Sequence, residues 1–500
     1  MKKSLVALAV LAATGAYAQS SVTLYGIVEG TTDIGYRRII ESTNTVSGFA
    51  ANGVAITTAP NFTAPTYRNQ GNTDSGNVLT FGAVANSGTT TVRSEQKNGF
   101  RVQDGSDQGS GTSRIGFRGT EDLGGGLKAN FQLEMGLRLD DGCTTLTSTG
   151  GCDNGGFSAN SGGSTFGRNA WGGISGSFGE FRIGRQVWGS YSTQANSSVS
   201  GASLGLYDAS TAGNAALAIG GVRASNALRY ITPNLGGFTG SIMFAAPETG
   251  APTNVSTSAP SPANSNNLVT TTGASRRTGV DLALEYANGP AYFGLGYNKR
   301  DLGNNTSSNT PFAAAGTGNN VASNISIGTV TAYTIGGSFD LGVVKPFLNY
   351  TRATTTSSRT DTASTGSSAT DTSVATSGDR TDRGYSIGLR APVGAFTIIT
   401  GYGRFRTNAS GQSFVTQASG STSYGQRSQF NTNAFQLGAQ YALSKRTLVE
   451  ANYGYNKVST STDSTVANSN IATNAGTAGS QNFRQSDRQS AFNVGLKHSF

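Results

Sequence analysis

Apolar and polar residues alternate with a period of two along much of the chain. The clearest segment runs from Leu127 to Leu139, where every odd position is apolar and every even position except Gly136 is polar or charged. The same alternation recurs over residues 280–286, 449–456 and 492–500. Because successive side chains of a strand point to opposite faces, each segment predicts a strand with one apolar and one polar face. No segment keeps a helical period for more than two turns.

The connectors between the predicted strands are of two kinds, which alternate along the chain. Seven are short turns rich in Gly, Pro, Asn and Asp, at residues 121–126, 177–180, 233–237, 288–290, 340–343, 392–395 and 443–446. Eight are long and rich in Ser, Thr, Asn and Gly, at about residues 38–110, 140–165, 189–222, 248–275, 301–327, 352–380, 405–430 and 458–487. These connections join sixteen antiparallel strands, with both chain ends on the side of the short turns.

This asymmetry of the connectors favours an all-β, 16-stranded antiparallel transmembrane β-barrel. A soluble sandwich also alternates apolar and polar positions, but it has no reason to gather every long loop on one side. A transmembrane barrel has an even number of strands, short periplasmic turns, long extracellular loops, an apolar outer face and a polar lumen. At this strand number the interior is too wide to be filled by side chains, so an aqueous channel is expected.

The first eighteen residues predict a secretory signal peptide. Lys2 and Lys3 precede an apolar run, and Ala16-Tyr17-Ala18 is a small-x-small cleavage site. We therefore expect residues 1–18 to be removed and residues 19–500 to form the barrel domain. No later segment offers the length of apolar sequence that a membrane-spanning helix needs.

Composition narrows the classes of function. The 500 residues include 70 Gly, only 13% are charged, and the single histidine is His498. Catalytic triads, His-ligated zinc and histidine acid–base chemistry are therefore disfavoured, and we expect no enzyme activity, no metal site and no cofactor. The net charge of +9 is scattered and forms no dense basic run, so nucleic-acid binding is not expected.

Ordered motifs make the chain resemble a general diffusion porin of the Gram-negative outer membrane, of the beta-proteobacterial type. They are Ser21-Val-Thr-Leu-Tyr-Gly26, the block over residues 113–129 that begins Ser-Arg-Ile-Gly-Phe-Arg-Gly, the stretch Phe178-Gly-Glu-Phe-Arg-Ile-Gly-Arg185, the run Ser225-Asn-Ala-Leu-Arg-Tyr230 and the terminal Phe500. The resemblance implies an integral outer-membrane barrel, a homotrimer in contact with outer-membrane lipid and lipopolysaccharide, and a third surface loop folded into the pore. The first loop, of about 70 residues, is unusually long, and no role is assigned to it.

The resemblance also implies arginines on the barrel wall opposite acids of the third loop. By motif, Arg114, Arg185 and Arg223 match the arginines of the pore constriction. Alternation directs further arginines into the lumen, namely Arg118, Arg182 and Arg229, and it agrees for Arg114 and, if the strand extends that far, for Arg223. Arg185 has the parity of the lipid-facing Phe181 and Ile183 unless Gly184 carries a bulge.

The third loop, residues 189–222, contains one acid, Asp208, and neither Lys nor Arg. An inward loop would then set several arginines against one carboxylate, and the positive potential would favour anions. The alternative is that these arginines pair with lumen acids such as Glu29, Asp33 and Glu134, which would leave a weakly selective pore.

Two further features belong to the loops and the chain end. Cys143 and Cys152 lie in the predicted second loop of a secreted chain, which favours a disulfide over free thiols or a metal site. Phe500 ends a strand with alternating apolar residues and resembles the signature read by the outer-membrane barrel assembly machinery; its alternative role is an interfacial anchor. Some strand tyrosines should form aromatic girdles.

Three classes of function fit these observations to different degrees. Passive diffusion of small hydrophilic solutes and anions through an open barrel fits best. A substrate-specific barrel transporter would need an aromatic track along the lumen, whereas the lumen-facing positions are mostly Gly, Ser, Asn, Gln and charged residues. A barrel hydrolase lacks a base, and a surface adhesin on a barrel scaffold stays open as a second activity of the long loops.

Overall fold

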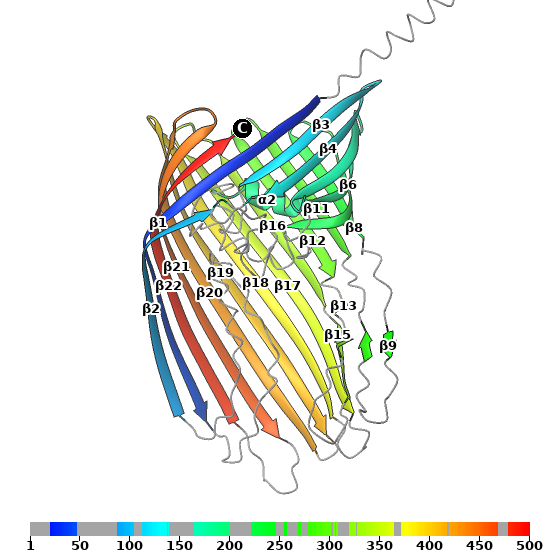
Figure 1. Ribbon diagram of the computed structural model, residues 1–500, viewed down its shortest axis with the longest axis vertical. Coiled ribbons are helices and arrows are strands. Elements are labelled where there is room, and N and C mark those ends of the chain that lie inside the picture. The colour runs from blue at the N-terminus through cyan, green and yellow to red at the C-terminus, as the bar shows by residue number, and fades with distance from the viewer. Residues whose placement is uncertain are drawn as a thin grey trace, which may run out of the picture.

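The chain forms a closed antiparallel barrel of sixteen strands (Figure 1). This computed structural model describes residues 21–47, 88–104, 113–137, 139, 165–199, 222–246, 255–257, 269–271, 278–301, 304–305, 307–308, 320–326, 328–364, 372–417, 420–468 and 479–500. The barrel strands are β1 (Ser21–Ser47), β3 (Arg114–Gly124), β4 (Leu127–Gly136), β5 (Asn169–Gly176), β6 (Gly179–Val187), β7 (Arg223–Ile231), β8 (Phe238–Ala245), β11 (Gly279–Asn288), β12 (Ala291–Asp301), β16 (Thr329–Phe339), β17 (Lys345–Ser364), β18 (Thr372–Val393), β19 (Phe396–Gln417), β20 (Gly420–Ala442), β21 (Thr447–Asn468) and β22 (Gly479–Ser499). Each pairs with the next, and β22 pairs with β1 to close the ring.

The predicted short turns are confirmed, and they lie together at one end of the barrel, which we call the short-turn rim. They join β3 to β4, β5 to β6, β7 to β8, β11 to β12, β16 to β17, β18 to β19 and β20 to β21. The first residues of β1 and the C-terminus lie at this rim as well (Figure 1). The opposite end, where the long connectors leave the strands, is called the long-loop rim.

The wall differs greatly in height around the ring. Strands β3 to β16 of the barrel have 8 to 11 residues, whereas β17 to β22 have 20 to 23 and β1 has 27. The predicted long connectors at residues 352–380, 405–430 and 458–487 were therefore wrong, because most of them continue as strand. These extensions carry Ser, Thr and Asn on both faces, so they show no alternation; threonine nevertheless fits the pleated conformation well.

The first predicted connector, residues 38–110, was also too long. β1 continues to Ser47 and pairs there with β2 (Gly88–Asp104), an additional strand outside the sixteen. β2 lies along the same edge of β1 that β3 occupies nearer the short-turn rim. Short strands also occur within two other predicted connectors, namely β9 (Val255–Thr257), β10 (Val269–Thr271), β13 (Asn304–Asn305), β14 (Ser307–Ser308) and β15 (Asn320–Ser326).

The predicted apolar face points outward, as a wall in contact with lipid requires. Exposed apolar side chains of the described wall alternate with buried small or polar ones, as in β11, where Leu282 and Leu284 are exposed and Asp281 and Ala283 are buried. Aromatic residues gather toward the rims. Packed pairs include Phe238–Tyr286 and Phe396–Tyr441 near the short-turn rim. Tyr297–Tyr333 and Tyr385–Tyr402 are packed pairs farther toward the long-loop rim. These belts are the girdles expected of a membrane barrel.

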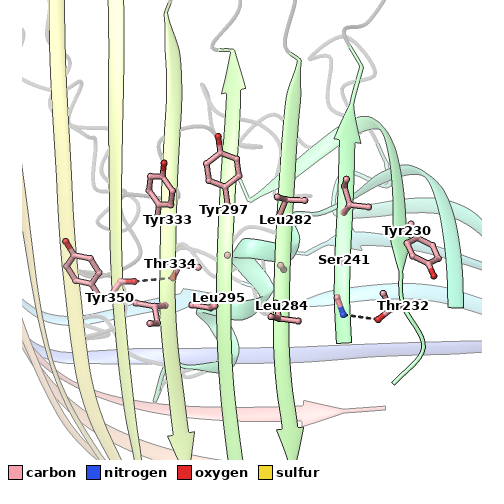
Figure 2. A pocket seen from close by; sticks show the side chains of 15 residues that line it. Tyr230, Thr232, Ser241, Leu282, Leu284, Leu295, Tyr297, Tyr333, Thr334 and Tyr350 are labelled. Carbon is pink, nitrogen blue, oxygen red and sulfur yellow. Dashed lines mark hydrogen bonds between the residues drawn. The ribbon is translucent and has the colours of Figure 1, made fainter. Parts of the chain in front are cut away.

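A shallow apolar groove of about 660 Å³ crosses the outer face of β8, β11, β12 and β16 (Figure 2). Leu282, Leu284 and Leu295 line it, and Tyr297 and Tyr333 border it. Gly240 lies opposite Leu284, and because it has no side chain the outer surface is depressed at this point. None of the helices in the described ranges is long and apolar enough to cross a bilayer.

Candidate pore constriction

A short helix, α2 (Gly189–Asn196), turns from the end of β6 into the barrel and lies against the inner face of β11, β12 and β16 (Figure 1). It begins the third long connector, so the expected inward fold of that loop is confirmed for residues 189–199. No side chain of its own caps its N-terminus. Instead, Asp281 of β11 accepts hydrogen bonds from the Ser190 amide, at 3.1 Å, and from the Ser190 hydroxyl. A wall carboxylate thus satisfies the free amide of the helix and complements its dipole.

Glycines in the wall make room for this inward segment. An added Cβ at Gly296 would lie 2.7 Å from the Cα of Ser190. At Gly336 and Gly388 it would overlap the side chains of Ser197 and Val199. Displacing a backbone atom or a closely packed side chain costs free energy. These positions therefore require glycine if the inward segment is to approach the wall as closely as it does.

Further hydrogen bonds hold the segment along its length. Glu285 accepts from the hydroxyls of Thr193, at 3.2 Å, and Tyr292, at 2.6 Å. Farther along, three wall side chains form hydrogen bonds with the segment. Thr351 Oγ1 accepts from Gln194 Nε2 of the segment at 3.1 Å. Asn349 Nδ2 donates to Ser197 Oγ and Arg390 Nε donates to the Val199 carbonyl, both at 2.8 Å. The segment is therefore part of the wall's polar network.

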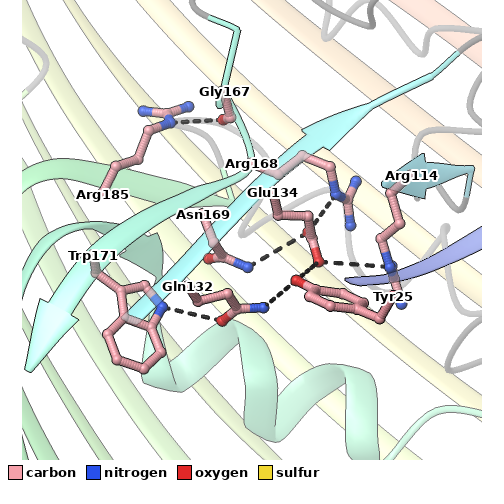
Figure 3. Close-up of polar contacts among 9 residues, drawn as sticks. All are labelled: Tyr25, Arg114, Gln132, Glu134, Gly167, Arg168, Asn169, Trp171 and Arg185. Carbon is pink, nitrogen blue, oxygen red and sulfur yellow. Dashed lines mark hydrogen bonds and ion pairs between the residues drawn. The ribbon is translucent and has the colours of Figure 1, made fainter. Parts of the chain in front are cut away.

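Arginines from neighbouring strands converge on Glu134 of β4 (Figure 3). The Nε of Arg168 lies 2.6 Å from Glu134 Oε1, and the Nε of Arg114 lies 3.7 Å from Oε2. Tyr25 donates its hydroxyl to the same carboxylate at 2.9 Å, and Gln132 donates to Tyr25 at 2.6 Å. In this network the Arg114 side chain lies on the inner face of the wall. The network also shows that Tyr25 belongs to the lumen and not to an aromatic girdle.

Arg168 is the principal residue that the sequence analysis missed. It lies one residue before β5, where alternation gives no direction, yet its guanidinium is almost completely buried against Glu134. Arg223, at the start of β7, lies within electrostatic range of Arg168, Arg185 and Tyr191 of α2. The buried Nε of Arg223 has no hydrogen-bond partner in the described residues. These contacts bring the arginine cluster beside the inward helix.

A second set of arginines lies closer to the short-turn rim. Arg182 pairs with Glu180 at 2.7 Å and stacks on the Trp171 ring, 4.1 Å from its centroid. Arg229 donates to the Val187 carbonyl at 3.3 Å and to Ser241 Oγ at 3.1 Å. Arg118 is exposed and lies over the Tyr25 ring, 5.2 Å from its centroid. All three side chains lie on the inner face of the wall.

Arg185 occupies an irregular position. The ladder between β6 and β7 shifts register between Gly184 and Gln186, and Gly184 has a φ of +127°. The ladder to β5 continues through Arg185 without a shift. The guanidinium donates to the Gly167 carbonyl at 2.7 Å and to Ser225 Oγ at 2.8 Å (Figure 3). The Gly167 carbonyl and the Ser225 hydroxyl thus hold Arg185 beside Arg168.

Exposure differs between the acids and the most exposed arginines of this region. The side chains of Arg114 and Arg182 are 27% and 24% exposed, and that of Glu180, the partner of Arg182, is 19% exposed, whereas Glu134 is 5% exposed and Asp281 is fully buried. The acids are used internally: Glu134 binds arginines, and Asp281 and Glu285 bind the inward segment. These three carboxylates are occupied by internal contacts, and Glu180 is paired with Arg182. The charges of this set that a passing ion can contact directly are therefore mainly positive.

Several predicted residues lie outside the described ranges. They are Asp208 of the third loop, Cys143 and Cys152 of the second loop, and the signal peptide at residues 1–18. Of the lumen acids considered as alternative partners, Glu134 does bind arginines, while Glu29 lies 3.6 Å from the Lys497 ammonium on β22.

Comparisons with known proteins agree on one kind of protein. A sequence profile described as Gram-negative porin matches residues 4–461. Outer membrane porin protein 32 of Delftia acidovorans is 31% identical over 249 residues, so the match spans 50% of this chain and 50% of that relative. An outer membrane porin protein of Bordetella pertussis is 28% identical over 482 residues, which cover 91% of this chain and 94% of the relative.

Two solved structures are similar to the chain over most of its length, at low sequence identity. The anion-selective porin from Comamonas acidovorans is 21% identical, with a TM-score of 0.45, and the match covers 96% of this chain and 100% of that structure. The trimer form of OmpT from Vibrio cholerae is 12% identical, with a TM-score of 0.46, and the match covers 96% and 99%.

Proposed function

The chain belongs to the Gram-negative porin family, and on this premise we propose that its outer-membrane barrel is a passive diffusion channel for small hydrophilic solutes that favours anions. The barrel provides the water-filled path, and the inward segment beginning at α2 narrows it. Partly exposed arginines from β3 to β7 border the path beside this segment. Diffusion through such a channel needs no catalytic group and no cofactor.

The unequal exposure of the two charge signs carries the proposal of anion preference. A low-dielectric wall concentrates the field of its exposed charges in the pore, so cations on that wall raise the local concentration of anions. Glu134, Asp281 and Glu285 are held in internal hydrogen bonds, and they neutralise the lumen less than their number suggests. The predicted Asp208 would reduce the preference without reversing it, since several arginines face it.

The zero-current potential of the refolded protein in a potassium chloride gradient tests this proposal. We expect chloride to permeate better than potassium, and we expect the Arg114→Gln/Arg223→Gln double variant to lose much of this preference. Arg37→Gln removes a charge from the outer face of β1 and should leave the potential unchanged. Equal permeation of both ions in the wild type would instead favour the weakly selective pore.

We also propose the assembly and processing steps that the family resemblance implies. The signal peptide, residues 1–18, would be removed, three copies would associate, and lipopolysaccharide would surround the barrel. The barrel assembly machinery would read Phe500, and Cys143 and Cys152 would form a disulfide that orders the second loop. The native mass of the detergent-extracted protein tests the trimer. A thiol titration of denatured, unreduced protein tests the disulfide, since two free thiols would refute it.

Phe500 can be tested separately as an assembly signal. If the residue acts only as an anchor, Phe500→Ala should impair refolding in detergent and insertion in cells equally. If the assembly machinery reads it, insertion in cells should fall much further than refolding does. Phe492→Ala, on the same face of β22, is the matched control for loss of an aromatic.

A further inference from the structure

Three arginines on adjacent strands stand side by side on the outer wall. The β-ladders pair Arg352 of β17 with Arg383 of β18, and Arg383 with Arg406 of β19. All three side chains are exposed, and the residues before and after each of them are buried or point inward. The three arginines therefore point away from the lumen. A fourth, Arg404, is exposed on the same face two residues from Arg406.

Such a row is unfavourable by itself. Residues directly opposite on neighbouring strands have Cβ atoms about 5 Å apart, and like charges in such pairs are destabilising. Among the described residues, none of these four guanidinium groups forms an ion pair with a carboxylate. Arg406 Nε donates a hydrogen bond to Asn408 Oδ1, on the same strand, at 3.3 Å. The exposed carboxylate of Asp379 lies four residues from Arg383 along β18, roughly 13 Å away, and that of Asp301 is farther, four residues beyond Tyr297 and two strands from Arg352. Asp382 is buried on the opposite face.

The row begins where the apolar wall ends. Arg352 lies directly opposite Tyr333 of β16, and it is two residues nearer the long-loop rim than the exposed Tyr350. Tyr385 lies opposite Arg404 and two residues nearer the short-turn rim than Arg383. Aromatic side chains of barrels mark the boundary between hydrocarbon and headgroups. The arginines therefore lie at headgroup level, on the side of the long loops, which faces outward in a porin.

The apolar groove of Figure 2 lies next to the arginine row, on the β16 side of Arg352. One cross-strand row runs through Ile242, Leu282, Tyr297 and Tyr333 and then reaches Arg352, Arg383 and Arg406. Tyr333 and Tyr350 stand on neighbouring strands at the edge of the groove (Figure 2). An apolar surface and a cationic cluster thus form one continuous face of the barrel.

We propose that this face binds the phosphorylated lipid portion of lipopolysaccharide, with its phosphates on the arginine row and an acyl chain in the groove. Guanidinium groups bind phosphate through paired, charge-assisted hydrogen bonds, and two neighbouring arginines can share one phosphate. The bound phosphate relieves the repulsion within the row. A neutral lipid would occupy the groove and leave the arginines unpaired. The inference deepens the lipopolysaccharide contact proposed above, and it adds the residues and the chemistry of the site.

Binding of fluorescent bisphosphorylated lipid A to the refolded full chain in zwitterionic detergent tests the site. The variant is Arg352→Gln/Arg383→Gln/Arg406→Gln. The control, Lys128→Gln/Lys445→Gln/Arg446→Gln, removes the same charge from exposed positions at the short-turn rim. We expect the arginine variant to bind at least about tenfold more weakly, the loss expected for one strong charge-assisted contact, and the control to bind as wild type does. Arg383→Gln alone should give part of this loss, and it serves if the triple variant does not fold.

Two further arms identify what is bound. Dephosphorylated lipid A should bind all proteins as weakly as bisphosphorylated lipid A binds the arginine variant, and inorganic phosphate should not compete at matched concentration. Equal binding by variant and wild type, equal binding of the dephosphorylated lipid, or displacement by inorganic phosphate would each overturn the proposal. Conductance and zero-current potential, measured in neutral-lipid bilayers, should be unchanged in the variant. A failure of the channel proposal would appear in these electrical measurements, separately from lipid binding.

Discussion

Gly26 and Phe500 exchange two backbone hydrogen bonds, each 3.1 Å long, where the first and last strands close the barrel. The Phe500 ring lies over Gly26, and a Cβ at Gly26 would overlap that ring and approach the Arg114 carbonyl to 2.7 Å. Closure of the barrel therefore depends on the absence of a side chain at Gly26 in β1 and on the large side chain of Phe500 after β22. Both lie at the short-turn rim, where the barrel has no long loops to hold the seam.

Gly26→Val should accordingly weaken the seam. The added side chain must displace Phe500 or the β3 backbone, a type of overpacking that costs about 1–3 kcal/mol. We expect a smaller folded fraction after refolding, measured by the shift in electrophoretic mobility between unheated and heated samples. Gly30→Val is the control on the same strand, because its nearest neighbour, a Leu139 methyl group, is 3.9 Å from the ideal Cβ. Equal effects of the two substitutions would contradict the role given to the Gly26–Phe500 contact.

Alternation and connector lengths predicted the fold because the membrane imposes both. Within the membrane each strand needs an apolar outer residue beside a polar inner one, so the apolar neighbours of Arg114, Arg118, Arg182 and Arg229 sufficed to assign these residues to the inner face. Beyond the membrane the outer face no longer needs apolar residues, and the long extensions of β17 to β22 lose that signature. Their Ser- and Thr-rich sequences could not be told from loops.

The constriction could be predicted only in part, because its geometry depends on contacts distant in sequence. α2 has no cap of its own and is held by Asp281, about ninety residues away along the chain. Arg168 is placed by Glu134 across a loop and not by strand parity. The residues that hold the inward segment, such as Gly296 and Gly336, are ordinary strand glycines in the sequence and gain their role from what packs against them.

Glu134 and Arg168 should change ion selectivity in opposite directions. Glu134→Gln removes the carboxylate that Arg168 and Arg114 share, so it should raise the preference for chloride. Arg168→Gln removes a cation from the same cluster and should lower it. One exposed charge about 4 Å from a permeating ion contributes about 1 kcal/mol in water, which is about a fivefold change in the local concentration of each ion, in opposite senses for chloride and potassium. Because the side chains of Glu134 and Arg168 are 5% and 10% exposed and do not contact the ion directly, we expect a smaller change than this. Zero-current potentials measure both variants, and changes of the same sign would refute this account of the cluster.

The wall glycines should control the width of the pore. Gly296→Val and Gly336→Val introduce side chains into space that Ser190 and Ser197 occupy, so the inward segment should move from the wall. We expect single-channel conductance to change and the folded state to become less stable to heat. Gly172→Val is the control, since its ideal Cβ has only the Asn130 carbonyl at 4.0 Å for a neighbour. Wild-type conductance in both Gly296→Val and Gly336→Val would contradict the claim that these glycines control the width of the pore.

Asp281 should be separable into its two effects, hydrogen bonding and charge. Asp281→Ala leaves the Ser190 amide and hydroxyl and the Asn298 amide without their acceptor, at a cost of about 1–3 kcal/mol for each buried group left unpaired. The start of α2 should then loosen, and single-channel recordings should show more current noise and closure at lower voltage. Asp281→Asn keeps an acceptor oxygen and loses the charge, so it should retain a quieter channel with a stronger preference for chloride. If the alanine and asparagine variants gave the same noise, hydrogen bonding by Asp281 would not be what holds the helix to the wall.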